Sequence, residues 1–168
     1  WESISNLECA HISDWDSLIV QSARNKVDIV RHDTHEKGIR KILNFGHTIG
    51  HAFESHFIKK GADITHGEAV AAGMICEAYI SSKEYEFECT QLNEIVNIID
   101  LNFKRFDIQH EDIESLMTFM KQDKKITYNQ FNFSLLRRLG KSVHDIQVNE
   151  DLIKESIIFH IERKNCNN

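Results

Sequence analysis

Proline is absent from all 168 residues of this chain. Proline breaks α-helices more strongly than any other residue, because it lacks an N–H donor and its ring clashes with the preceding turn. Apolar residues also recur every three or four positions over several long stretches, which is the period of an amphipathic helix. We therefore expect most of the chain to be helical. The expected helices span residues 15–31, 38–57, 66–83, 90–103, 111–121 and 149–163.

Two stretches near the C-terminus predict strands instead. Residues 131–136 and 142–148 alternate or cluster their apolar side chains as short strands do, and Leu139, Gly140 and Lys141 lie between them. No Gly/Ser-rich linker divides the chain, and its length is enough for one domain with a sizeable core. The expected fold class is all-α, a single multi-helix domain over residues 1–168 with a small β-hairpin.

Charge and composition restrict the partners of this domain. The formal net charge is -6 and the chain has no long basic run, which argues against nucleic acid as a partner. No stretch approaches the roughly 20 apolar residues of a membrane span, and the first residues lack a signal-peptide pattern. We expect a cytoplasmic protein with small-molecule partners. The four cysteines form no C-x-x-C pair, so we expect reduced thiols.

Histidines are concentrated in one region. His47 and His51 are four residues apart and would project from the same face of a helix, while His66 precedes an apolar run that predicts a helix start. Three imidazoles with acidic groups nearby suit a divalent metal such as Zn²⁺. The chain has ten histidines, so spacing alone leaves a second interpretation open, namely hydrogen-bonded histidines at helix ends.

The motifs around these histidines resemble the 3-dehydroquinate synthase family. Residues 43–54 read LNFGHTIGHAFE and residues 66–74 read HGEAVAAGM, which is similar to the family signature. A downstream match is MKQDKK at residues 120–125, followed by FSLL at 133–136 and Leu139-Gly140. With Lys26 and the segment that ends at Arg40, the resemblance runs from about residue 20 to residue 148.

The resemblance implies an activity for the complete protein. Members convert 3-deoxy-D-arabino-heptulosonate 7-phosphate, a phosphorylated sugar acid, to 3-dehydroquinate and phosphate in the shikimate pathway. They use NAD⁺ and a divalent metal, Zn²⁺ or Co²⁺, and form homodimers. The family's NAD-binding α/β domain and its third metal ligand, a Glu, belong upstream of residue 1. We therefore expect the chain alone to be inactive and to hold metal poorly.

The resemblance also assigns roles residue by residue. It implies that His47 and His66 bind the metal, that His51 transfers protons and that Asn44 contacts the substrate. Glu68 would accept a hydrogen bond from a ligand imidazole.

Cations in the same motifs are implied to bind the substrate's acidic groups. Lys26 and Arg40 match residues that hold the carboxylate, and Glu36 would orient Arg40. Lys124 or Lys125 matches a lysine that reaches the phosphate. After this block the family has a Gly that residues 126–130 lack, where Asn129 would supply the turn instead.

Two alternatives remain open. A related sugar-phosphate cyclase, such as 2-deoxy-scyllo-inosose synthase, shares the metal and NAD⁺, although Lys26 and Arg40 favour the shikimate substrate. A non-catalytic helical interaction module would use the histidines only structurally. The enzyme interpretation requires that Asn44, His47, His51 and His66 face a common cleft.

Overall fold

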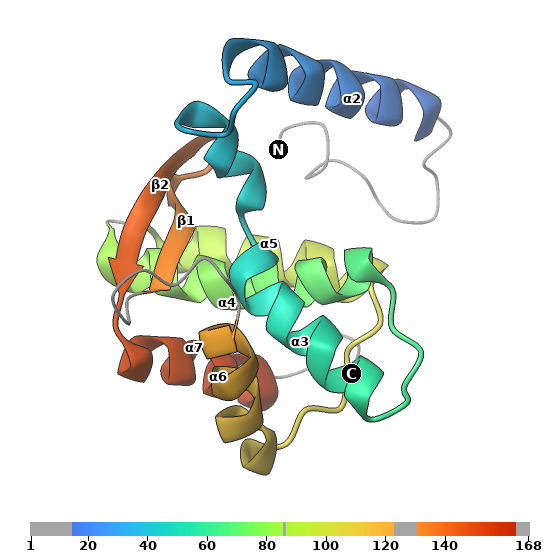
Figure 1. Ribbon diagram of the computed structural model, residues 1–168, viewed down its shortest axis with the longest axis vertical. Helices are drawn as coiled ribbons and strands as arrows, with labels where there is room; N and C mark the ends of the chain where they lie inside the picture. Colours follow the sequence, from blue (N-terminus) through green and yellow to red (C-terminus); the bar gives the residue numbers. More distant parts are fainter. Residues whose placement is uncertain (1–14, 86, 123–130, 164–168) are drawn as a thin grey trace.

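The computed structural model describes residues 15–85, 87–122 and 131–163. It is a helical domain with one antiparallel hairpin, which confirms the predicted fold class (Figure 1). None of the described helices is long and apolar enough to cross a membrane. In chain order the elements are α2 (Trp15–His32), the 3₁₀ helix η1 (Ile39–Asn44), α3 (His47–Lys59), α4 (His66–Glu84), α5 (Cys89–Asn102), the 3₁₀ helix η2 (His110–Asp112), α6 (Ile113–Gln122), β1 (Phe131–Arg138), β2 (Lys141–Val148) and α7 (Glu150–Glu162).

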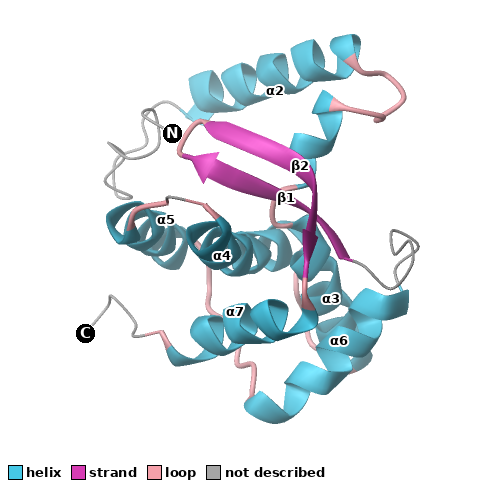
Figure 2. Ribbon diagram, turned by 90° about the vertical axis from the view of Figure 1, so that its left-hand side faces the viewer, coloured by secondary structure: helices cyan, strands magenta, loops and turns pink. Residues whose placement is uncertain are grey.

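Helix α4 is the centre of the domain. It contacts α3, α5, α7 and β1, so nearly every face of the helix is covered (Figure 2). Small and apolar side chains make this burial feasible, including Ala69, Ala72, Ile75 and Ala78. The helix begins at the predicted place, because Thr65 forms a reciprocal capping box with the third residue of the first turn.

Helix α2 differs from the rest of the domain. Its main contacts with the described residues are with η1, and Figure 1 shows it apart from the other helices. Apolar side chains on this helix stay in solvent, as the exposed fractions of 61% for Ile19 and 46% for Val27 show. The apolar core instead lies between α3, α4, α6, α7 and the hairpin.

The single helix predicted over residues 38–57 was wrong. The chain forms η1, breaks at Gly46, and begins again as α3. Gly46 has φ 83°, a left-handed conformation that glycine adopts without strain. A Cβ on this residue would lie 2.5 Å from Met74 Cγ and 2.8 Å from the Val70 carbonyl oxygen of α4. The break is therefore imposed by packing against α4, which a helical period cannot reveal.

The hairpin confirms both predicted strands and extends each toward the turn. Phe131 pairs with Val148 and Arg138 with Lys141, and Gly140 has φ 77° in the turn. The Leu136 N–H donates to Ser81 Oγ of α4 at 3.0 Å, and both strands contact η1. The hairpin thereby holds the segment before α3 against the body of the domain. The turn role predicted for Asn129 falls outside the described residues.

Candidate functional site

Three imidazoles meet where α3 and α4 begin. His47 is the first residue of α3, His51 lies one turn later, and His66 is the first residue of α4. The ring centroids are 5.5 Å apart for His47–His51, 5.4 Å for His47–His66 and 5.6 Å for His51–His66. We call these three residues the histidine cluster. The expectation that His47 and His51 share a helix face is confirmed.

Glu54 lies on α3 beside the histidine cluster. Its Oε2 is 3.1 Å from His66 Nδ1, and ligand atoms of His51, Glu54 and His66 all lie within 4.8 Å of one another. Glu54, rather than the expected Glu68, is therefore the carboxylate that lies beside the His66 ring. The Glu68 carboxylate instead accepts hydrogen bonds from Thr65 N at 2.9 Å and Thr65 Oγ1 at 2.7 Å, which lower the pKa of Glu68 below its usual value.

The donor set fits a divalent transition metal. His47 Nδ1 lies 3.3 Å from the Phe45 carbonyl oxygen, and His66 Nδ1 faces Glu54. With the proton on each Nδ1, the lone pair of each ring is on Nε2, the arrangement common in metal-binding histidines. Imidazole nitrogens with a carboxylate oxygen nearby suit Zn²⁺ and Co²⁺.

A polar segment, residues 33–44, leads into α3. Its turn is ordered by Asp33, whose carboxylate accepts the Lys37, Gly38 and Arg40 N–H groups at 3.0, 2.7 and 3.1 Å. Hydrogen bonds from these backbone groups, that of Lys37 foremost, lower the pKa of Asp33. The polar segment therefore begins as a turn ordered around the Asp33 carboxylate and continues as the 3₁₀ helix η1.

Glu36 connects two of the predicted substrate residues. Its Oε1 accepts from Asn44 Nδ2 at 2.7 Å, and its Oε2 lies 3.8 Å from Arg40 Nε. Arg40 also donates from Nη1 to the Thr34 carbonyl oxygen at 3.0 Å. Glu36 and Arg40 therefore lie close together, as predicted, and Asn44 also contacts Glu36.

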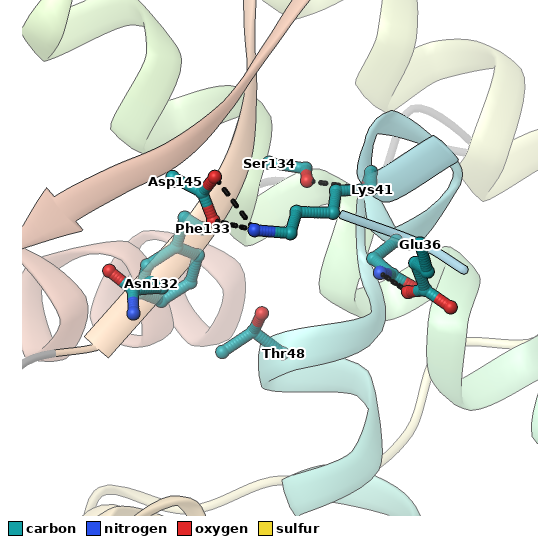
Figure 3. A pocket seen from close by; sticks show the side chains of 8 residues that line it. Glu36, Lys41, Thr48, Asn132, Phe133, Ser134 and Asp145 are labelled. Carbon is teal, nitrogen blue, oxygen red and sulfur yellow. Dashed lines mark hydrogen bonds and ion pairs between the residues drawn. The ribbon is translucent and has the colours of Figure 1, made fainter. Parts of the chain in front are cut away.

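A pocket of about 280 Å³ lies between the polar segment, the start of α3 and the hairpin (Figure 3). In it, Lys41 Nζ is 2.8 Å from both carboxylate oxygens of Asp145, and Ser134 Oγ donates to the Lys41 carbonyl oxygen at 2.6 Å. Thr48 lines this pocket and also a second hollow of about 210 Å³ that His51 lines. The residues that line the larger pocket are Glu36, Lys41, Asn44, Thr48, Asn132, Phe133, Ser134 and Asp145.

One predicted site residue lies apart from this group. Lys26 has an exposed side chain midway along α2, the helix that stands apart from the body. Lys124 and Lys125 lie outside the described residues. The structure thus brings His47, His51 and His66 together, while Asn44 lines the neighbouring pocket, whose lining includes none of the three histidines.

Three residues of the site were missed by sequence reasoning. Glu54 follows His51 by three positions, so helical spacing alone places both on one face and would have found it. Lys41 and Asp145 are 104 residues apart and meet only because the hairpin folds back over η1. No local pattern indicates such a pair.

Comparisons with known proteins identify relatives of this chain. Residues 1–126 match the family model described as 3-dehydroquinate synthase C-terminal. A 3-dehydroquinate synthase from Parabacteroides distasonis is 39% identical over 157 residues, which are 94% of this chain and 43% of that protein. Another, from Picrophilus torridus, is 40% identical over 145 residues, which are 85% of this chain and 41% of that protein.

Solved structures share the fold. A 2-deoxy-scyllo-inosose synthase complexed with carbaglucose-6-phosphate, NAD⁺ and Co²⁺ has a TM-score of 0.66 and 29% identity over 79% of this chain and 37% of its own. A 2-epi-5-epi-valiolone synthase from Streptomyces hygroscopicus with NAD⁺ and Zn²⁺ bound has a TM-score of 0.73, covering 88% of this chain and 40% of its own. At 15% identity, the second shows the fold alone.

The chain spans about two fifths of the length of the curated relatives it matches, 43% and 41% in the two cases above. Those relatives and the family model cover most of the chain, from its first residues through the histidine cluster. The chain belongs to the 3-dehydroquinate synthase family.

Proposed function

We propose that this chain is the metal- and substrate-binding domain of a 3-dehydroquinate synthase. The complete protein would convert 3-deoxy-D-arabino-heptulosonate 7-phosphate to 3-dehydroquinate and phosphate, a step of the shikimate pathway. The observation that carries the proposal is the convergence of His47, His51 and His66 beside a polar pocket. Histidines with purely structural roles need no such meeting point.

Residues of the histidine cluster have separate roles in this proposal. His47 and His66 hold the metal through Nε2, while Glu54 fixes the orientation of the His66 ring by accepting from Nδ1. His51 lies beside both rings and lines a hollow, so its imidazole can carry a proton to or from a bound hydroxyl or phosphate.

Cations and amides bind the substrate. Arg40 suits the carboxylate because its planar guanidinium forms paired hydrogen bonds. Lys26, on the helix that stands apart from the body, is the second cation that the resemblance implies. Asn44 donates from its amide beside the pocket, where Glu36 orients it. Lys124 or Lys125 binds the phosphate.

The cofactors complete the chemistry of the whole protein. A bound Zn²⁺ or Co²⁺ would polarise the alcohol to be oxidised, and NAD⁺ would accept and later return the hydride. We expect a homodimer in which a separate α/β domain binds NAD⁺, so this chain alone has no turnover.

Turnover by the complete protein tests the proposal. Phosphate release from 3-deoxy-D-arabino-heptulosonate 7-phosphate is measured with NAD⁺ and Zn²⁺ for the wild type, His47→Ala, His66→Ala and the control His110→Ala. His110 is exposed and pairs with Glu162 at 3.5 Å, away from the histidine cluster. Both cluster variants should lose at least about 100-fold in rate, since metal polarisation of a substrate oxygen is worth several kcal/mol. Full activity in either cluster variant would contradict the assignment.

A second candidate is a cyclase of the 2-deoxy-scyllo-inosose synthase type, since one such structure is 29% identical to this chain. That structure holds a carba analogue of glucose 6-phosphate, which has no carboxylate. Phosphate release from glucose 6-phosphate, and none from the heptulosonate, would establish this candidate instead.

A further inference from the structure

A buried carboxylate lies against the start of the helix that carries two of the cluster histidines. Glu77 of α4 is 0% exposed. Its Oε2 accepts the Gly46 N–H at 2.6 Å, and its Oε1 accepts the Thr48 and Ile49 N–H groups at 3.1 and 3.4 Å. These contacts cross from α4 to α3 and span 28 to 31 residues of sequence.

The contacts replace a cap that α3 lacks. The first N–H groups of a helix have no partner within the helix, and Gly46 at the N-cap has no side chain to supply one. The Glu77 carboxylate supplies charge-assisted acceptors at the positive end of the helix. A fully buried carboxylate is costly unless it is satisfied in this way, so its position is tied to these amides.

The two helices are also pressed together beside Glu77. One turn earlier on α4, a Cβ on Gly73 would lie 2.1 Å from the Gly46 carbonyl oxygen and 2.6 Å from Gly50 N. The two backbones are therefore in contact. At this contact Glu77 fixes the rotation of α3 about its own axis and its position along α4. His47 begins α3 and His66 begins α4, so the same contact sets the distance between their rings.

We propose that Glu77 is a positioning residue for the metal site: by holding the first amides of α3, it fixes where His47 and His51 lie relative to His66. This inference rests on the proposed function for the identity of the metal site. The hydrogen bonds described above join Glu77 to backbone amides of α3, so its effect on the rings passes through the backbone.

A purely stabilising role is the alternative, and another buried charge offers the matched control. Asp100 of α5 forms a two-pronged pair with Arg163 at 2.7 and 3.1 Å, with the Arg163 and Asp100 side chains 4% and 9% exposed. Loss of this pair weakens the domain at the end of α7, without contact with the start of α3.

The experiment compares Glu77→Gln with Asp100→Asn in the complete protein. Affinity for Co²⁺ is measured by visible absorption, and melting temperature is measured for each variant. Glu77→Gln keeps the shape but replaces one acceptor oxygen with an NH₂ group, so Co²⁺ should bind about 10- to 100-fold more weakly, the range for loss of a group that orients a ligand. Asp100→Asn should lower the melting temperature with Co²⁺ affinity within about threefold of wild type. Equal Co²⁺ affinity in both variants would overturn the proposal.

Amide hydrogen exchange gives a second readout that needs no metal. Exchange in a peptide covering residues 46–50 should accelerate in Glu77→Gln but not in Asp100→Asn, whose effect should fall on α5 and α7. Unchanged exchange there would overturn the proposal. A wild type that binds no Co²⁺ and releases no phosphate would refute the proposed function, while this readout still tests Glu77. If Glu77→Gln does not fold, Glu77→Asp, which withdraws the carboxylate by one methylene, takes its place in both measurements.

Discussion

The histidine cluster and the polar segment are neighbours, yet they are held in place by different forces. Behind the cluster, α3 and α4 touch through glycines, and the supporting carboxylate of Glu77 is 0% exposed. The polar segment is held by partly exposed pairs, such as Lys41–Asp145, whose side chains are 31% and 49% exposed. A metal ligand tolerates little displacement, whereas a substrate-binding segment can adjust as substrate enters and leaves. The difference matches the proposed roles of the two regions.

The helix crossing behind the cluster should be the most sensitive position. In Gly73→Ala, the new methyl group would meet the backbone of Gly46 and Gly50, and only movement of α3 could relieve the clash. We expect a loss of about 3 kcal/mol in the free energy of unfolding, the upper range for overpacking, together with weakened Co²⁺ binding. Denaturant unfolding measures the first effect.

Gly67→Ala on the same helix is the matched control. A Cβ at Gly67 meets no atom within 4 Å, so this variant should gain about 0.5–1 kcal/mol from reduced backbone freedom. Equal effects of the two substitutions would show that the close crossing has no special importance.

Much of the helical pattern was predictable because it depends on local sequence. The start of α4 follows from Thr65 and Glu68 at capping-box spacing, and the ends of the hairpin follow from alternation and Gly140. The break at Gly46 was missed because it depends on contact with Val70 and Met74, which no local pattern encodes.

The candidate site likewise has features that local sequence predicts and features that it does not. Helical spacing brings His47 and His51 together, and the apolar run after His66 indicated that this third histidine lies at a helix start. Glu77 was overlooked because a lone acidic residue in an apolar helix has no sequence signal for its partners, which lie on another helix. Long-range polar contacts are therefore the part of the site that required the structure.

Acid should weaken the packing of α7 on α3, the helix that carries His47 and His51. His160 of α7 is 1% exposed and packs on Phe53 of α3, with ring centroids 5.4 Å apart. Burial, together with the nearby Arg163 and Arg105, lowers the pKa of His160 well below 6.5. Below about pH 6.5 the unfolded chain therefore binds a proton that the folded chain does not. The free energy of unfolding is therefore not reduced by His160 above this pH. Below it, the free energy of unfolding should fall by up to about 1.4 kcal/mol per pH unit.

His160→Phe keeps a ring of similar size and removes the titration. Thermal unfolding between pH 7.5 and pH 5.5 should show a shallower loss of stability in this variant than in the wild type. His56, whose burial also lowers its pKa, keeps some acid sensitivity in both proteins. Parallel pH profiles would show that His160 does not cause the loss.

The smallest effect is expected at the pair that joins the polar segment to the hairpin. Asp145 has φ 59°, which asparagine also tolerates, so Asp145→Asn removes the charge without backbone strain. The hydrogen bond from Lys41 is the main cause of the lowered pKa of Asp145, so the Asp145 carboxylate is ionised at neutral pH. Loss of a partly exposed pair should cost under about 1 kcal/mol of stability.

In Asp145→Asn, KM for the substrate should change while the affinity for metal does not. Lys41 and Asp145 line the pocket, so a looser polar segment should raise KM by about threefold to tenfold, equivalent to about 1.4 kcal/mol at most. Co²⁺ affinity should stay unchanged, because the histidine cluster has its own support. Glu114→Gln, which breaks the exposed pair with Lys154, is the control and should leave KM unchanged. A change in Co²⁺ affinity, with KM constant, would mean that the two regions are not independently supported.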